Sequence, residues 1–158
     1  MIATESIPKT DIRTLDISSA AFAGNTYIPS KYTCDGENTN PPLNIGNIPK
    51  ETRSLALIVD DPDGPIRIWT HWIVWNIPPT KKIKEGNTIG LEGLNDFGQY
   101  NYGGPCPPSG IHHYHFKVYA LDNVLDLKKS SAKHDLEKAI SSHIIAFGEL
   151  IGLYKKAL

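Results

Sequence analysis

Residues 69–76, Trp-Thr-His-Trp-Ile-Val-Trp-Asn, are almost entirely aromatic or β-branched, and this stretch decides the fold class of the chain. Such residues favour strands, because their bulky side chains pack well on a pleated, partly buried surface. Side chains alternate between the two faces of a strand, so a period of two predicts one face made of Trp69, His71, Ile73 and Trp75. The stretch therefore predicts a strand that carries a histidine among tryptophans.

Three more segments indicate strands. Residues 54–59 form a continuous apolar run, which is typical of a strand buried on both faces. Residues 112–120 alternate in polarity and predict an inner face made of His112, Tyr114, Phe116 and Val118. Residues 143–154 fit either a helix or a strand, and Gly148 and Gly152 favour the strand, because glycine weakens a helix interior.

The helical signal is confined to one place. Residues 136–140 carry apolar side chains at helical spacing, and Ser131 is the predicted N-cap of that helix. Residues 29–49 and 79–110 are rich in glycine and proline, so we expect both to be irregular. Many strands, one late helix and no alternation of strands with helices predict a mostly β, largely antiparallel fold. Without repeats or a linker, we expect a single domain over residues 1–158.

The composition excludes some functions. The chain has 16 Lys and Arg against 17 Asp and Glu, a balance without the basic excess of a nucleic-acid-binding protein. The sequence contains no run of about 18 apolar residues, so we expect no membrane span. Residues 1–14 lack the pattern of a secretory signal. Cys34 and Cys106 are expected to be reduced thiols of a cytoplasmic protein, unless their two loops meet and the pair is bridged. The sequence leaves the oligomeric state open, a homodimer included.

Acidic residues follow the first buried strand. Asp61 and Asp63 belong to the string Asp-Pro-Asp-Gly-Pro, directly after residues 54–59. A carboxylate that leaves a buried strand lies at the rim of its sheet, although the same string is typical of a plain turn. His71 is a second candidate, and a structural histidine buried in the core is the alternative for it.

A second pair of candidates lies around residue 110. The segment of residues 102–110 is rich in glycine and proline, so it either presents backbone N–H groups to a small anion or forms a stiff loop. His112 and Tyr114 share a strand face and can reach one pocket. A carboxylate such as Asp61 favours the charged form of nearby imidazoles. Imidazolium, a tyrosine hydroxyl and loop amides together suit a phosphate or a carboxylate.

Two other functions remain open at this point. Cys106 and His112 could form the nucleophile pair of a hydrolase, or the acid, the histidines and the tyrosine could perform acid–base chemistry. His113 and His115 have the spacing of a metal-binding pair. They lie on the strand face opposite His112, however, and three convergent ligands are not apparent. We therefore predict no metal and no cofactor.

The ordered set of these strings resembles the phosphatidylethanolamine-binding protein family, and in particular its bacterial and archaeal branch of Raf kinase inhibitor-like proteins. The resemblance spans residues 12–154. Its matching strings are Tyr32-Thr-Cys-Asp-Gly-Glu-Asn38, Pro41-Pro-Leu43, Asp61-Pro-Asp-Gly-Pro65, Trp69-Thr-His-Trp72, Asn76-Ile-Pro78, Asn95-Asp-Phe-Gly98, Tyr102-Gly-Gly-Pro-Cys-Pro-Pro108, His112-His-Tyr114, Tyr119-Ala-Leu-Asp122 and Gly148-Glu-Leu150.

The resemblance implies a large antiparallel sheet packed with a smaller one, plus peripheral helices. It also implies a small pocket for phosphate or phosphoethanolamine-like head groups, in a protein that binds rather than turns over its ligand. Relatives inhibit kinases or proteases or act in signalling, so a protein partner is implied as well. The pocket residues that it implies are Asp61, Asp63, His71, Cys106, Pro107, Pro108, His112 and Tyr114.

Two departures limit what the resemblance carries over. Thr70 stands where animal members often have a second histidine, which puts any role of such a pair in doubt. Animal members also extend beyond the last strand with a helix that covers the pocket. Here the sequence ends at Leu158, so we expect a more open pocket without that lid.

Overall fold

The computed structural model of the chain describes residues 11–157, which form two β-sheets and one α-helix. The large sheet has the strand order β1-β9-β8-β4-β5-β7, and the small sheet has the order β2-β3-β6. The large sheet consists of β1 (Arg13–Thr14), β4 (Ser54–Asp61), β5 (Trp69–Ile77), β7 (Leu91–Glu92), β8 (His112–Leu121) and β9 (Ile144–Tyr154). The small sheet consists of β2 (Asp16–Ser18), β3 (Leu43–Gly46) and β6 (Lys82–Ile83).

The large sheet is largely antiparallel, as predicted, and has one parallel pairing at its edge. β1 runs parallel to β9, with Arg13 opposite Ala146, whereas every other pairing in the sheet is antiparallel. Side-chain alternation predicts which face of a strand is buried, but it carries no information on strand direction. The predicted strand nature of residues 143–154 is confirmed by β9.

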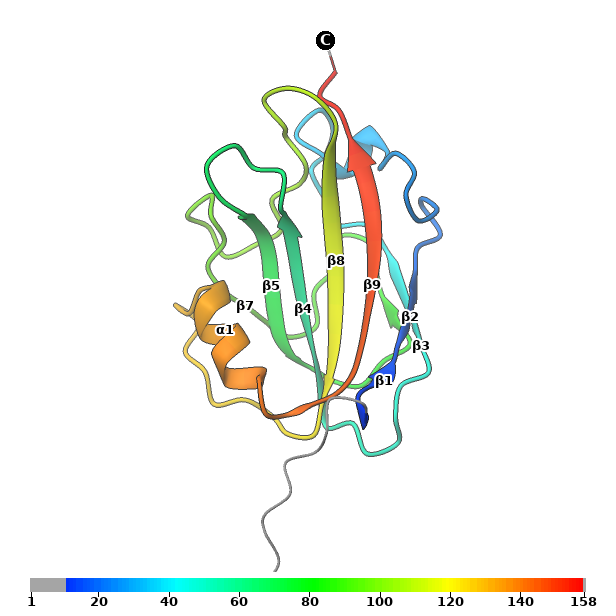
Figure 1. Ribbon diagram of the computed structural model, residues 1–158, viewed down its shortest axis with the longest axis vertical. Helices are drawn as coiled ribbons and strands as arrows, with labels where there is room; N and C mark the ends of the chain where they lie inside the picture. The colour runs from blue at the N-terminus through cyan, green and yellow to red at the C-terminus, as the bar shows by residue number, and fades with distance from the viewer. Residues whose placement is uncertain (1–10, 158) are drawn as a thin grey trace, which may run out of the picture.

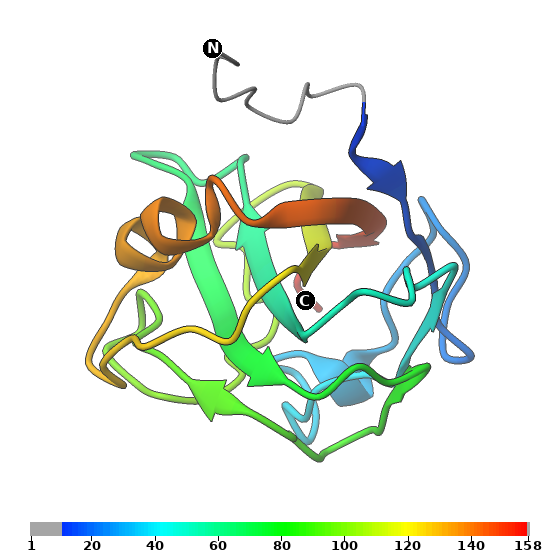
Figure 2. The same cartoon turned by 90° about the horizontal axis from the view of Figure 1, so that it is seen from below.

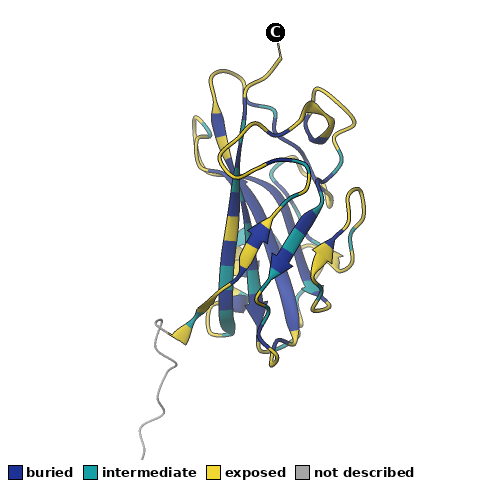
Figure 3. Ribbon diagram, turned by 90° about the vertical axis from the view of Figure 1, so that its right-hand side faces the viewer, coloured by how far each residue is buried: buried dark blue, intermediate teal, exposed yellow. Residues whose placement is uncertain are grey.

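The molecule has three layers, with the large sheet in the middle (Figures 1 and 2). The small sheet covers one face and helix α1 (Lys133–Ile140) covers the other. As a result, every residue of β4 is buried, as its continuous apolar run predicts. The burial colours of Figure 3 show the same arrangement, with exposed residues gathered in the loops and at the outer strands.

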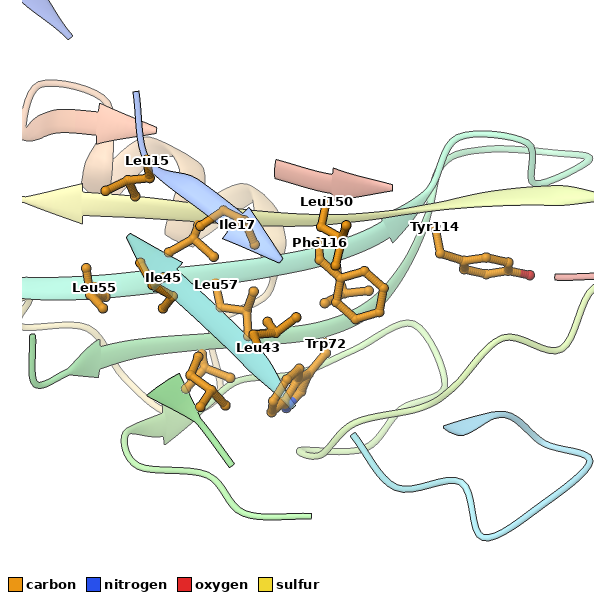
Figure 4. Packing of buried hydrophobic residues seen from close by; sticks show 14 of the residues in the cluster. Leu15, Ile17, Leu43, Ile45, Leu55, Leu57, Trp72, Tyr114, Phe116 and Leu150 are labelled. Atoms are coloured by element: carbon orange, nitrogen blue, oxygen red, sulfur yellow. The ribbon is translucent and has the colours of Figure 1, made fainter. Parts of the chain in front are cut away.

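The main core lies between the two sheets. Leu43 and Ile45 of β3 face Leu57, Trp72 and other inward residues of the large sheet (Figure 4). These side chains are almost wholly removed from water, and burial of each is worth about 1.5–3 kcal/mol. Tyr114, two residues before Phe116 on the same face of β8, lies at one end of this row (Figure 4).

The N-cap of helix α1 lies one residue later than the sequence predicts. Ala132, not Ser131, occupies the N-cap position, and its backbone N–H donates to Oδ2 of Asp135 over 2.9 Å. The side chain of Asp135 thus satisfies the N–H of the N-cap residue, which is one half of a capping box, whereas alanine has no side-chain oxygen to accept from the N–H groups of the first turn. Leu136 and Ile140 then pack into a second core under the helix.

A β-bulge in β5 changes the side on which His71 lies. Val59 pairs with Trp72 and Asp60 pairs with Thr70, so the one residue between them, His71, has no partner of its own. A bulge inserts one residue and interrupts the alternation of faces. Ile73 and Trp75 pack under α1, whereas His71 contacts Tyr114 on the opposite face of the sheet. The predicted shared face of these three residues is therefore wrong.

Cys34 and Cys106 form a disulfide across 72 residues of sequence, which corrects the prediction of reduced thiols. Their Cα atoms lie 5.4 Å apart, because two loops that are remote in sequence meet beside the large sheet. The bridge also removes one of the two grounds on which a cytoplasmic location was expected. No helix within residues 11–157 is long and apolar enough to cross a membrane.

Candidate functional site

A cavity of about 290 Å³ lies at one end of the large sheet. The loop from β4 to β5 and the loop before β8 meet at this end of the molecule, at the top of Figure 1. Of the eight residues predicted for a pocket, seven line this cavity, namely Asp61, His71, Cys106, Pro107, Pro108, His112 and Tyr114. The structure therefore brings together residues from two neighbouring strands, β4 and β5, from β8 and from the loop before it.

Asp61 and His112 form a buried pair in the cavity. The carboxylate can only accept, so Nδ1–H of His112 donates to Oδ2 of Asp61 over 2.6 Å. Oδ1 of Asp61 accepts from the backbone N–H of Asp63 over 2.8 Å. Both oxygens of Asp61 are thus engaged, which fixes the carboxylate and, through it, the imidazole ring. Within the described residues, the second ring nitrogen of His112 makes no hydrogen bond, so a ligand can reach it.

His71 is buried and held by the cavity's own loop. Its Nδ1–H donates to the carbonyl of Gly103 over 2.7 Å, and only 3% of the residue is exposed. Burial lowers the pKa of His71 below its ordinary value of 6.5, although the hydrogen bond to Gly103 and the charge of Asp61 act to raise it. His71 is therefore neutral at pH 7. The expectation that Asp61 keeps both imidazoles charged is wrong for His71, because desolvation outweighs the nearby carboxylate.

Tyr114 carries a buried hydroxyl that makes no hydrogen bond of good geometry within residues 11–157, although the Asp61 carboxylate and the backbone of Cys106 lie near it. The residue is 1% exposed. Burial raises the pKa of Tyr114 far above its ordinary value, and the charge of Asp61 adds to this effect, so the hydroxyl remains a donor. A buried hydroxyl that lacks a hydrogen bond costs about 1–3 kcal/mol. This position therefore favours a ligand that accepts a hydrogen bond.

The cavity wall, residues 102–108, is held on both sides. The N–H of Gly103 donates to the carbonyl of His71 over 3.0 Å, and the N–H of Gly104 donates to Oδ1 of Asn38 over 2.8 Å. Gly104 approaches residue 32 so closely that any side chain there would collide with the carbonyl oxygen of Tyr32. Glycine is thus required at position 104.

Asp63 does not line the cavity, unlike the other predicted pocket residues. Its Oδ2 accepts from both the backbone N–H and Nδ1–H of His113, over 2.8 and 2.7 Å. Burial acts to raise the pKa of Asp63, but these two hydrogen bonds outweigh it and lower the pKa. His115 contacts a different carboxylate, Glu149, so the two outer histidines of β8 do not share a ligand. Within the described residues, no three potential metal ligands converge.

Sequence reasoning missed the outer part of the cavity. Trp69 is only partly buried and lines the cavity together with Phe97, whose ring lies 5.6 Å away. Arg67 also lines it, with its guanidinium 5.5 Å from the Trp69 ring and one nitrogen 3.1 Å from Oδ1 of Asp96. Ile66 is 94% exposed at the same edge. The bulge in β5 could not be located from the sequence, so Trp69 was grouped with Ile73 and Trp75, which pack under α1 instead.

The fold and the cavity define a class of two-sheet β-proteins with one small cavity at the end of the larger sheet. The chain belongs to the phosphatidylethanolamine-binding protein family, whose sequence model matches residues 18–155. The resemblance that the sequence motifs indicated is thereby confirmed.

Similar proteins support this assignment. A UPF0098 protein of Pyrococcus abyssi is 50% identical over 149 residues, which cover 87% of this chain and 84% of the relative. The crystal structure of a putative phosphatidylethanolamine-binding protein homolog from Chlamydia trachomatis is 42% identical, with a TM-score of 0.88 over 92% of this chain and 99% of that one. The structure of YbcL from E. coli, described as a new member of the mammalian family, is 30% identical. Its TM-score is 0.84 over 90% of this chain and 99% of that one.

Proposed function

We propose that the protein binds a small anion of the phosphate or phosphoethanolamine type in the cavity, without turning it over. The observation that carries this proposal is the buried Tyr114 hydroxyl, which makes no hydrogen bond of good geometry within residues 11–157 and lies in the same cavity as His71 and His112. An oxyanion can accept from this hydroxyl, and from each imidazole once its second ring nitrogen carries a proton. Membership of a family named for phosphatidylethanolamine binding supports the same ligand class.

Proton uptake accompanies binding in this proposal. The second nitrogen of a neutral His71 is an acceptor, so it repels an oxyanion until it gains a proton. A bound anion favours the charged imidazole, because an opposite charge raises the pKa of a histidine. Affinity is therefore expected to fall as the pH rises. Inorganic sulfate is a suitable probe, because it does not change its own protonation near neutral pH.

The alternative of a cysteine hydrolase finds less support. Cys106 is held in a disulfide, and a sulfur bonded to another sulfur is not a thiolate nucleophile. Asp61 and His112 can orient and polarise a bound group, but the cavity lining offers no serine or threonine hydroxyl beside them. The same pair in a non-enzymatic site fixes the imidazole that contacts the anion.

A protein partner would meet the loops that surround the cavity. Ile66 is exposed and Phe97 is half-exposed, and both line the cavity. Ile111 is exposed next to the cavity residue His112. Exposed apolar residues grouped around a binding site are typical of surfaces that meet another molecule. An inhibitory or signalling role through such a partner is part of the proposal, and the partner's anionic residue would occupy the cavity.

Thermal unfolding with inorganic phosphate, phosphoethanolamine or citrate tests the proposed function. A ligand at about 100 times its Kd adds about 2.7 kcal/mol to the free energy of unfolding. We expect the wild type and a His143→Gln variant to be stabilised, because His143 pairs with Asp122 on the surface, remote from the cavity lining. His112→Gln should lose most of the effect. Equal stabilisation of all three proteins would contradict the proposal.

A further inference from the structure

One half of the disulfide belongs to the cavity, and the other half faces solvent. Cys106 lines the cavity between the buried Pro105 and Pro107, whereas Cys34 is exposed in a surface loop. The proposed anion binding makes no use of this bond, since its donors are histidine and tyrosine side chains. A covalent link between a ligand cavity and an exposed sulfur therefore needs a separate explanation.

The loop of residues 32–38, here called the strap, contacts the cavity wall and is exposed only from Cys34 to Asn38. The N–H of Cys34 donates to the carbonyl of Pro105 over 3.1 Å. The Tyr102 hydroxyl donates to the carbonyl of Tyr32 over 2.8 Å, and Asn38 accepts from Gly104. Together with the disulfide, these contacts tie the wall to the strap at four successive points.

The cavity wall in turn determines the shape of the cavity and the orientation of His71. The carbonyl of Gly103 accepts the Nδ1 proton of His71, which fixes the ring and leaves its other nitrogen for the cavity. Pro107 and Pro108 form one side of the cavity directly. Any loosening of the wall therefore changes both the shape of the cavity and the orientation of His71.

We propose that the Cys34–Cys106 disulfide is a thiol-exchange site, at which small-molecule thiols such as glutathione open the bond and weaken anion binding. The effect on binding rests on the proposed function, whereas the exchange itself does not. The exposed side of the bond is the Cys34 side, so the attacking thiolate approaches there.

The exchange proceeds in two balanced steps. A thiolate attacks Sγ of Cys34 and forms a mixed disulfide, while the bond to Cys106 breaks and Cys106 leaves as a thiolate that takes a proton from water. A second thiol attacks the mixed disulfide and releases Cys34. In total, two small thiols are oxidised to their disulfide, and the protein bond takes up two electrons and two protons.

Ligand and redox state are linked in both directions. If the oxidised form binds the anion more tightly by some factor, the anion must make the bridge harder to reduce by the same factor. The equality follows from thermodynamics alone. It distinguishes a coupled site from a bridge that only happens to lie nearby.

The test equilibrates the full chain with buffers of reduced and oxidised glutathione, with and without saturating inorganic phosphate. Alkylation and mass spectrometry then report the fraction of bridged protein. We expect reduction without unfolding at 20 °C by circular dichroism, and a phosphate Kd at least about fivefold higher in the reduced form. The glutathione ratio at half reduction should shift with phosphate by the same factor as the Kd. A Cys34→Ser/Cys106→Ser variant should bind like the reduced form and ignore glutathione.

Each contrary outcome overturns one part of the proposal. A bridge that glutathione reduces only in denaturant, or a reduced chain that unfolds, excludes the exchange site. Equal Kd values in two folded redox states exclude the coupling. If even the oxidised protein fails to bind phosphate, the proposed function fails. Hydrogen exchange of residues 102–108 in the two redox states then tests whether reduction loosens the cavity wall. Identical exchange in both redox states then overturns the loosening of the wall.

Discussion

Nδ1 of His112 lies 2.6 Å from Oδ2 of Asp61, and both side chains are buried at the end of the large sheet. The two residues are 51 positions apart, and they meet because β4 and β8 are antiparallel neighbours. Asp60, the residue before Asp61, points to the other face, where Lys117 and Lys133 pair with it. One strand end thus supplies one carboxylate to the cavity and one to the packing of helix α1.

Asp61→Asn tests whether the charge of this carboxylate, rather than its size, orients His112. The amide retains the shape but weakens the charge-assisted bond to His112, so we expect a loss of about 1–3 kcal/mol in the free energy of unfolding. Phosphate affinity should fall as well, because the ring is no longer held. Urea unfolding and calorimetric titration measure the two effects. Asp122→Asn removes the exposed counterpart contact to His143 and should change stability by less than about 0.5 kcal/mol.

Tyr114→Phe should affect binding without harming the fold. Its hydroxyl makes no hydrogen bond of good geometry in the described part of the chain, so its removal relieves a desolvation cost while the ring packing remains. We expect an unchanged or raised free energy of unfolding together with a weaker phosphate affinity. Chemical denaturation and titration of the same preparation give both values. A destabilised variant with normal affinity would show that the hydroxyl has a structural role instead.

The pH dependence of stability should include a contribution from His71. Its pKa in the folded protein lies below the ordinary value of 6.5, so the unfolded chain binds more protons between these two values. The contribution is therefore complete above about pH 6.5 and is lost as the pH falls below it toward the lowered pKa. We expect His71→Gln to lose less stability than the wild type between pH 7.5 and pH 5. Parallel pH profiles from urea unfolding would refute the burial of a neutral imidazole.

Loss of the disulfide should lower global stability as well as loosen the cavity wall. The bridge closes a loop of 72 residues, and the loop-closure entropy predicts a loss of about 4 kcal/mol in the free energy of unfolding. The Cys34→Ser/Cys106→Ser variant in urea measures this loss against the oxidised wild type. The slope against urea should fall in the wild type relative to the variant, because the bridged unfolded chain exposes less surface.

The sequence by itself determined the four long strands, the family and seven residues of the cavity lining. It did not predict β3, β6 and β7, because these short strands lie in the glycine- and proline-rich segments that were expected to be irregular. Period-two alternation in residues 112–120 correctly placed His112 and Tyr114 on the buried face, and the apolar run before Asp61 correctly predicted a strand buried on both faces. These features are local. They depend on the polarity of side chains and on the geometry of an extended backbone, and both can be inferred from neighbouring residues.

Only the tertiary structure decided the features that give the site its chemistry. The bulge that moves His71 across the sheet arises from the register between β4 and β5, which no single strand specifies. Desolvation makes His71 neutral, and desolvation depends on everything packed around the ring. The Cys34–Cys106 bond and the parallel pairing of β1 with β9 likewise require distant segments to meet. Local pattern therefore determined the buried faces of β4 and β8, whereas long-range contact decided the face of His71, the partners of the site residues and their charge.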